Sequence, residues 1–159
     1  MNLGIEKNKN IEKALKNIIG KRAWGVRLGH GSFITIEFGK PKPAEDPKSV
    51  SVYGEWHFWV YLCSWRLERK GLLWVGCEDK RLKIETVIKE IENKRLLDFD
   101  VYFPSLDAIL KFESGIELKL FSIISEDVEG GGQHWMLFMP GEKVLVAGPG
   151  SYLEVESEK

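Results

Sequence analysis

The chain has 159 residues, with 23 basic and 24 acidic side chains and a formal net charge of −1. Opposite charges are interspersed, so no basic stripe predicts binding to nucleic acid. No apolar run approaches the roughly 20 residues of a membrane span, and the first residues lack the apolar core of a signal peptide. We therefore expect a single cytoplasmic domain over residues 1–159, with neither a nucleic-acid nor a membrane partner.

The first predicted element is a short amphipathic helix in residues 11–22, IEKALKNIIGKR. Ile11, Leu15 and Ile18 recur at i, i+4 and i+7, which places them on one apolar stripe. Asn10 stands where an N-cap is wanted. Gly20 is the residue type that best adopts the left-handed conformation found just after a helix.

Two alternating strands around a Gly31-Ser32 turn follow this helix. Ile34, Ile36 and Phe38 alternate with polar residues, a pattern that indicates one buried and one solvated face. A proline-rich, charged loop over residues 41–53 comes next.

The most unusual stretch is residues 52–68, VYGEWHFWVYLCSWRLE, which is apolar on both faces of a strand. Such a segment predicts one long strand at the centre of a sheet. Its tryptophans are interpreted as core, and an aromatic binding surface is the alternative. Cys63 lies in this segment and Cys77 in the next apolar one, which is typical of buried thiols in a reducing compartment.

The second half of the chain repeats the pattern of the first. Residues 84–95, IETVIKEIENKR, match residues 11–22 at six of twelve positions without a gap, and Asn93 takes the place of Gly20. A hairpin, a loop over 125–133 and a tryptophan-led strand follow in the same order. The pattern predicts a duplication, with repeats at 9–79 and 82–150, an extra strand near residues 99–103, and a C-terminal tail at 151–159.

These elements together predict an α+β fold. We expect mainly antiparallel β-structure, as a sheet, sandwich or barrel-like arrangement, with two short amphipathic helices. The two halves should be pseudo-symmetric and pair their sheets across a two-fold axis, because each half alone is too small for a robust core.

No motif in the sequence predicts catalysis. His30, His57 and His134 lack the spacing of a metal site, and phosphate-binding, dinucleotide and nucleophile-elbow patterns are missing. We therefore predict no catalytic residue, metal or cofactor. If the halves are related, His57 and His134 occupy nearly equivalent places and could approach each other across the axis.

The segments DAILKFESGIELKLFS and HWMLFMPGEKVLVAGPG, within residues 105–150, have a cadence of strand, Ser-Gly turn, strand and tryptophan strand. This cadence resembles that of small bacterial proteins of unknown function, some of which are immunity proteins encoded beside toxins. The resemblance implies one specific protein partner and carries over no functional residue.

The leading hypothesis is a non-enzymatic interaction module that binds a protein through the loops at 41–53 and 125–133. The alternative is a small-ligand-binding protein or enzyme with a pocket between the halves. Homodimerisation through an exposed sheet edge is compatible with either. The candidate binding residues are Trp56, His57, Trp59, His134 and Trp135.

Overall fold

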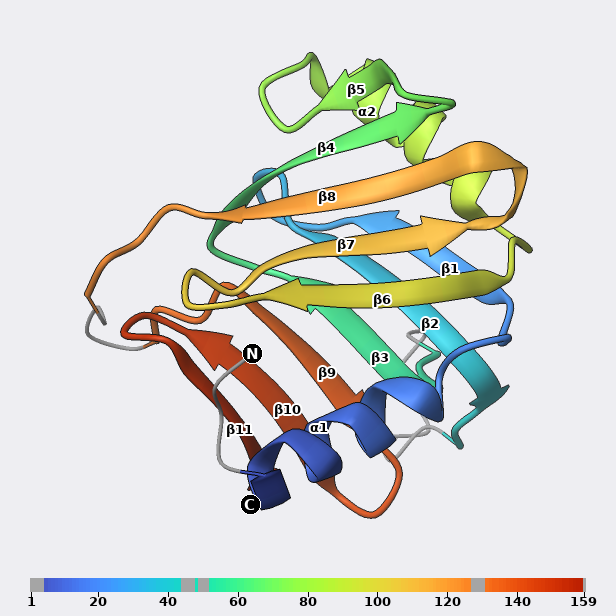
Figure 1. Cartoon of the computed structure of the whole chain (residues 1–159). Coiled ribbons are helices and arrows are strands. Elements are labelled where there is room, and N and C mark those ends of the chain that lie inside the picture. Colours follow the sequence, from blue (N-terminus) through green and yellow to red (C-terminus); the bar gives the residue numbers. More distant parts are fainter. Residues whose placement is uncertain (1–4, 44–47, 49–51, 127–130, 159) are drawn as a thin grey trace.

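The computed structural model describes residues 5–43, 48, 52–126 and 131–158, and its described part consists of two antiparallel sheets and two α-helices (Figure 1). The six-stranded sheet has the order β1-β2-β3-β9-β10-β11. Its strands are β1 (Ala23–Leu28), β2 (Ile34–Pro41), β3 (Gly54–Val60), β9 (Trp135–Met139), β10 (Lys143–Gly148) and β11 (Tyr152–Ser157). The predicted fold class, α+β with mainly antiparallel strands, is confirmed.

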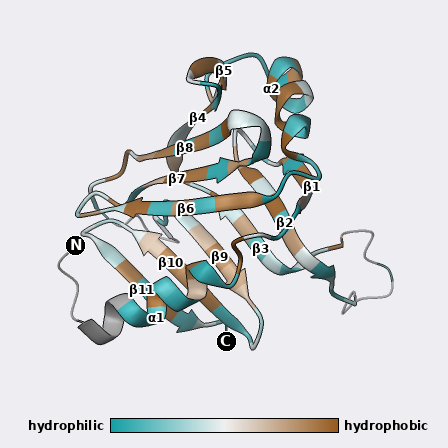
Figure 2. Ribbon diagram, turned by 45° about the vertical axis from the view of Figure 1, so that its right-hand side comes forward, coloured by the Kyte–Doolittle hydropathy of each residue, from teal (hydrophilic) through white to brown (hydrophobic). Residues whose placement is uncertain are grey.

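The five-stranded sheet has the order β5-β4-β8-β7-β6 and crosses in front of the first sheet at a steep angle (Figure 1). Its strands are β4 (Cys63–Arg69), β5 (Leu72–Gly76), β6 (Leu96–Tyr102), β7 (Asp107–Phe112) and β8 (Ile116–Ser122). Hydropathy alternates along these strands (Figure 2), as expected when one face is buried and the other solvated.

The main hydrophobic core lies between the two sheets. Phe38 of β2 stacks on Phe112 of β7, with 6.5 Å between ring centroids. Phe58 of β3 meets Phe99 of β6 edge-on at 5.5 Å, and Phe99 in turn contacts Trp135 of β9 at 5.4 Å. Aromatic rings from both sheets therefore interlock at the centre of the molecule.

Both predicted helices form, but each begins before the predicted range and ends before its stop signal. Helix α1 spans Ile5–Lys16, and α2 spans Arg81–Ile88 and continues into the 3₁₀ turn η1 (Lys89–Ile91). Asn10 is therefore inside α1 and not its N-cap. Gly20 and Asn93 both have positive φ, +90° and +65°, in agreement with the predicted left-handed stop signals. None of the described helices combines the length and the apolar character needed to cross a membrane.

The tryptophan-rich stretch is two strands and not one. Strand β3 ends at Val60, the chain turns a corner at Tyr61 and Leu62, and β4 begins at Cys63 in the other sheet. The corner changes the alternation, so Val60 and Cys63 are both buried. An uninterrupted strand would instead have placed them on opposite faces. Each piece lies inside its sheet, which accounts for its apolar character.

A local two-fold relation links the segments that follow the two helices. Residues that differ by 73 in number, such as Ile11 and Ile84, correspond in the sequence match. The Gly20 N–H donates to the Leu96 carbonyl at 2.7 Å, and the corresponding Asn93 N–H donates to the Ala23 carbonyl at the same distance. Arg22 bridges its own counterpart, Arg95, in antiparallel fashion. Equivalent residues that pair with each other indicate an axis passing between these two arginines.

The strand order follows the same relation. Matching β1–β5 in sequence with β6–β10 converts the order β1-β2-β3-β9-β10 into β6-β7-β8-β4-β5, the order of the five-stranded sheet. The strand near 99–103 is therefore the counterpart of β1 and is not extra. The strand without a counterpart is β11, which forms from residues expected to be a tail, because it pairs along the whole of β10. The topology supports the duplication, which stays a prediction.

Candidate functional site

The two outer faces of the molecule differ in chemistry. On the five-stranded sheet, the outer face carries charged residues that pair across strands. Glu68 accepts a hydrogen bond from Arg66 at 2.7 Å, and its carboxylate lies 3.1 Å from the Lys119 ammonium of the neighbouring strand. Burial acts to raise the pKa of Glu68, but these two partners outweigh it, and the pKa is lowered from its ordinary value. This face is the solvated surface that an antiparallel sheet ordinarily presents.

The outer face of the six-stranded sheet is apolar across three adjacent strands. Trp59 pairs opposite Met136, which pairs opposite Val146, and Phe138 pairs opposite Val144. Cross-strand partners point to the same face of a sheet. We call this cluster the aromatic face; its members are Trp59, Tyr61, Met136, Phe138, Val144 and Val146.

The aromatic face has a buried floor and a partly exposed upper layer. Met136, Val144 and Val146 are only 8%, 6% and 7% exposed. The rings of Trp59, Tyr61 and Phe138 are partly buried and pack against them. Because this cluster is separate from the main core, its aromatic rings contribute surface at which another molecule can pack.

Further rings extend the aromatic face at both ends. Phe33 lies 4.7 Å from Tyr61, and His30 lies 6.3 Å from Phe33. At the other end, the His57 ring lies 5.6 Å from Phe138 and 4.8 Å from Tyr53. These rings form a row across this side of the molecule, interrupted by the Met-Val floor of the aromatic face.

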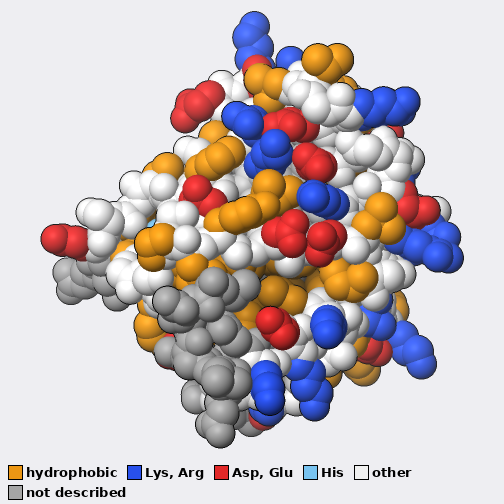
Figure 3. Space-filling model, viewed as in Figure 1, with side chains coloured by type: hydrophobic (Ala, Val, Ile, Leu, Met, Phe, Trp, Pro, Cys, Tyr) orange, Lys and Arg blue, Asp and Glu red, His pale blue; other side chains and the backbone are white. Residues whose placement is uncertain are grey.

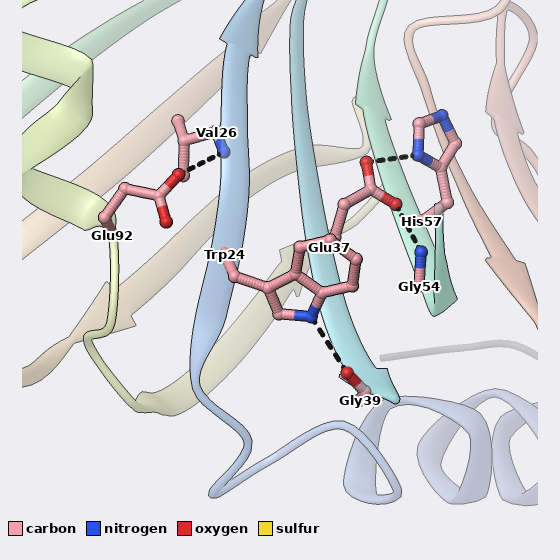
Figure 4. Close-up of polar contacts among 7 residues, drawn as sticks. All are labelled: Trp24, Val26, Glu37, Gly39, Gly54, His57 and Glu92. Carbon is pink, nitrogen blue, oxygen red and sulfur yellow. Dashed lines mark hydrogen bonds and ion pairs between the residues drawn. The ribbon is translucent and has the colours of Figure 1, made fainter. Parts of the chain in front are cut away.

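A buried carboxylate anchors the His57 end of the row (Figure 4). Glu37 of β2 lies opposite His57 of β3 and is only 2% exposed. One of its oxygens lies 2.7 Å from His57 Nδ1, and the other accepts the Gly54 N–H at 2.9 Å. The carboxylate therefore fixes the orientation of the imidazole.

The neighbouring backbone leaves room for this carboxylate. Gly25 of β1 has φ +59°, and a Cβ atom there would lie 3.0 Å from Cγ of Glu37. The Trp24 indole N–H donates to the Gly39 carbonyl at 2.8 Å, which fixes the adjacent edge of the site. Glycine at position 25 is thus required both by its positive φ and by the close approach of Glu37.

The Glu37–His57 pair resembles part of an acid–base constellation, but the described residues supply no third member. The His57 ring has no second hydrogen-bonding partner among them, so no hydroxyl or thiol is positioned for activation. The arrangement can orient a ring on a binding surface and satisfy a buried carboxylate.

The five residues predicted from the sequence do not form one site. His57 and Trp59 lie on the outer face, whereas Trp135 is fully buried and Trp56 packs against the main core. The Lys21 ammonium lies over the Trp56 ring, 4.6 Å from the ring centroid. His134 is 2% exposed, at the corner where the chain passes between sheets.

The two histidines expected to converge are separated. His57 pairs opposite Phe138, four residues beyond His134, a separation of roughly 13 Å along a strand. The groove between α1 and β6 is lined by none of the five predicted residues. In the predicted binding loops at 41–53 and 125–133, residues 44–47, 49–51 and 127–130 lie outside the described residues.

His134 predicts a pH dependence of stability. Its Nδ1 atom is buried without a hydrogen-bonding partner, and burial lowers its pKa below the ordinary 6.5, although the nearby Leu62 backbone and the charge of Asp107 act in the opposite direction. As the pH falls through 6.5, the unfolded chain therefore takes up this proton before the folded chain does. Urea unfolding should show lower stability at pH 5 than at pH 7.5, and less of a decrease in His134→Gln. The exposed His30→Gln control should behave like the wild type; an equal pH dependence in His134→Gln would contradict the assignment.

The two cysteines are free thiols; Cys63 begins β4, and Cys77 lies in the turn just after β5. The Trp65 N–H lies 3.5 Å from Cys77 Sγ. Burial, with smaller contributions from Cys77 and Asp107, raises the pKa of Cys63 to about 12. A thiol that stays protonated at neutral pH is a poor nucleophile, so Cys63 is a packing residue.

Sequence reasoning did not identify most of the aromatic face. Met136, Phe138, Val144 and Val146 belong to strands whose apolar residues are consecutive, MLFM and VLVA. These consecutive apolar residues could have indicated an apolar outer face, because apolar and polar residues alternate in a strand with one solvated face. Glu37 gave no signal, since it occupies an ordinary polar position in an alternating strand.

No protein-family model, curated protein or solved structure matches the chain.

Proposed function

We propose that this chain is a non-catalytic interaction module that binds one protein partner through the aromatic face. The observation that carries the proposal is the contrast between the two outer faces: one sheet presents paired charges, and the other presents aromatic rings over a Met-Val floor. Burying an apolar surface of this kind against a partner is favourable in proportion to its area.

The composition of the aromatic face supports a protein partner. Tryptophan, tyrosine, phenylalanine and methionine are enriched at the centres of protein interfaces, and charged residues concentrate at the rim. A rim of this kind is present on β11, where Glu154 and Glu156 lie opposite Val146 and Val144. Acidic residues beside the rings favour a partner with a basic border.

The resemblance to immunity proteins suggests a narrower version of the proposal. In that version the partner is a toxin encoded by a neighbouring gene, and binding blocks its activity. Co-expression should then restore growth to cells that express the toxin, and substitutions in the aromatic face should remove this protection.

Affinity capture from cells of the source organism tests the general proposal. Phe138→Ala and Trp59→Ala should each weaken retention of a stoichiometric protein by at least roughly 30-fold, the effect of losing an interface anchor worth about 2 kcal/mol. The matched control is Phe121→Ala, because Phe121 is a partly buried aromatic residue on the outer face of the other sheet.

Two outcomes would contradict the proposal. One is retention of the same stoichiometric protein by all three variants, and the other is the failure of the wild type to retain any. Light scattering on the purified chain tests a third outcome, in which the partner is a second copy of the chain. In that case the wild type is a dimer and Phe138→Ala is a monomer. Circular dichroism of each variant checks that the fold is intact.

A further inference from the structure

A groove lies between α1 and β6, apart from the aromatic face. It has a volume of about 200 Å³. In Figure 3, recessed hydrophobic side chains appear between acidic side chains where these two elements meet. Its apolar lining is Ile11, Leu15, Ile19, Phe99, Val101 and Phe103, and its charged lining is Glu12, Lys16, Asp98 and Asp100.

The two-fold relation provides a counterpart for this groove, between α2 and β1. There the helix segment satisfies the outward backbone of the edge strand. The Glu92 carboxylate accepts the Val26 N–H at 2.7 Å (Figure 4), and the Lys89 ammonium donates to the Val26 carbonyl. Arg81 donates to the Leu28 carbonyl at 3.2 Å. This counterpart is closed by the chain's own side chains.

At the α1–β6 groove, Lys16 keeps the residue type found at Lys89, but the position of Glu92 differs. Ile19 stands at the position of Glu92, and Phe99 and Val101 stand at those of Val26 and Leu28. Isoleucine has no carboxylate to offer to the edge strand. The Phe99 N–H instead bonds to the neighbouring Asp98 side chain at 2.9 Å. The difference leaves the groove open.

Strand β6 is the last strand of its sheet. The Phe99 N–H is directed away from β7, and Val101, two residues further along, has the same orientation in an antiparallel strand. Among the described residues, no hydrogen bond reaches the Val101 N–H or the Phe99 and Val101 carbonyls from outside the sheet. An unpaired edge of this kind is a template for an added strand.

We propose that the α1–β6 groove binds an extended, basic segment of a partner protein, which adds to the edge of β6 as a further strand. Main-chain hydrogen bonds to Phe99 and Val101 take the place of the Glu92, Lys89 and Arg81 contacts in the closed counterpart. Alternate apolar side chains of the segment enter the groove, as is general for recognition by strand addition.

The charge of the lining selects the kind of segment. Three carboxylates, Glu12, Asp98 and Asp100, surround the groove against the single ammonium of Lys16. Lys111 lies 3.8 Å from Asp100 and offsets part of that charge. Basic residues on the solvent side of the segment would face this acidic rim.

Titration of the isotopically labelled full chain with a capped lysine–valine peptide, KVKVKVK, tests the proposal by NMR. We expect the amides of Phe99 and Val101 and those along α1 to shift, and the glutamate–valine peptide EVEVEVE to bind at least about tenfold more weakly. Val101→Pro removes the N–H from an outward edge position, which sheets tolerate, and should weaken binding about tenfold.

Ile19→Glu supplies the complementary test. It restores the carboxylate found at Glu92 and should close the groove. The added negative charge alone would make the lysine peptide bind more tightly. Weaker binding of that peptide to Ile19→Glu would therefore show that the new carboxylate has closed the groove. The proposal is overturned if the lysine peptide leaves the β6 amides unshifted at millimolar concentration, if both peptides bind equally, or if Val101→Pro binds like the wild type. Concentration-dependent β6 shifts without peptide would instead assign the edge to a second copy.

Discussion

Phe38→Ala should lower the free energy of unfolding by about 3–5 kcal/mol, the range measured when a fully buried phenylalanine is truncated. Phe38 is 0% exposed and stacks on Phe112 of the opposite sheet. Removing its ring leaves a cavity between sheets that cannot move together, because each is held by its own ladder of hydrogen bonds. Urea denaturation followed by tryptophan fluorescence measures the change.

Phe121→Ala is the matched control for this prediction. Phe121 lies on the outer face of the five-stranded sheet, partly buried beneath the guanidinium of Arg66, 5.2 Å from its ring centroid. Phe121→Ala should lower the free energy of unfolding by less than half as much as Phe38→Ala, because it leaves no closed cavity. Equal losses for the two variants would contradict the placement of the core between the sheets.

Glu37→Ala should lower the free energy of unfolding by about 2–4 kcal/mol. This is a large effect for a substitution on the outer side of a sheet. The change leaves two groups without their acceptor, the buried Gly54 N–H and the His57 ring, and each unsatisfied group costs about 1–3 kcal/mol. The His57 side chain is 17% exposed, so water replaces part of the lost contact there and the total stays below two full penalties. Thermal and urea unfolding of the variant measure the loss.

A double-mutant cycle with His57→Phe isolates the pair. We expect a coupling energy of about 0.5–3 kcal/mol between positions 37 and 57. Glu117→Ala is the control, because Glu117 faces outward beside Lys119 at 3.9 Å and surface ion pairs contribute less than about 1 kcal/mol. A loss in Glu37→Ala no larger than that in Glu117→Ala would show that the Glu37 carboxylate is not a structural anchor.

The helices were predictable because their signals are local. The stripe of Ile84, Ile88 and Ile91 is buried in the structure, and Asn93 has the left-handed φ expected of its position. The starts of both helices were misplaced, because α1 begins at residue 5 and not 11, and α2 at residue 81 and not 84. The exact start of a helix depends on how the residues before the apolar stripe are arranged, and hydrophobic periodicity does not encode this.

The strand correspondence between the halves was less accessible. Period-2 alternation is shared by every strand with one buried face, so phase alone matched the 34–38 strand to the 116–120 strand. The helix match, continued without a gap, places β1 on β6, and the hydrogen bonds around Arg22 and Arg95 agree with that alignment. Extending the helix match along the chain without a gap therefore identifies corresponding strands better than strand phase does.

Of the candidate site, the sequence identified His57 and Trp59 but grouped them with residues of the opposite face and of the core. The tryptophan-rich segment contains no glycine or proline at Tyr61-Leu62, so nothing local indicates that the chain changes sheets there. The change is imposed by packing, since it lets Val60 and Cys63 both enter the core.

The sequence by itself determined the class of fold, the two helices and their stop signals, because backbone propensity and hydrophobic periodicity act within a few residues. Only the tertiary structure decided which strands share a sheet, which outer face is apolar and which of two equivalent grooves stays open. Those features depend on contacts between residues far apart in the chain, such as Glu92 with Val26 and Phe138 with His57.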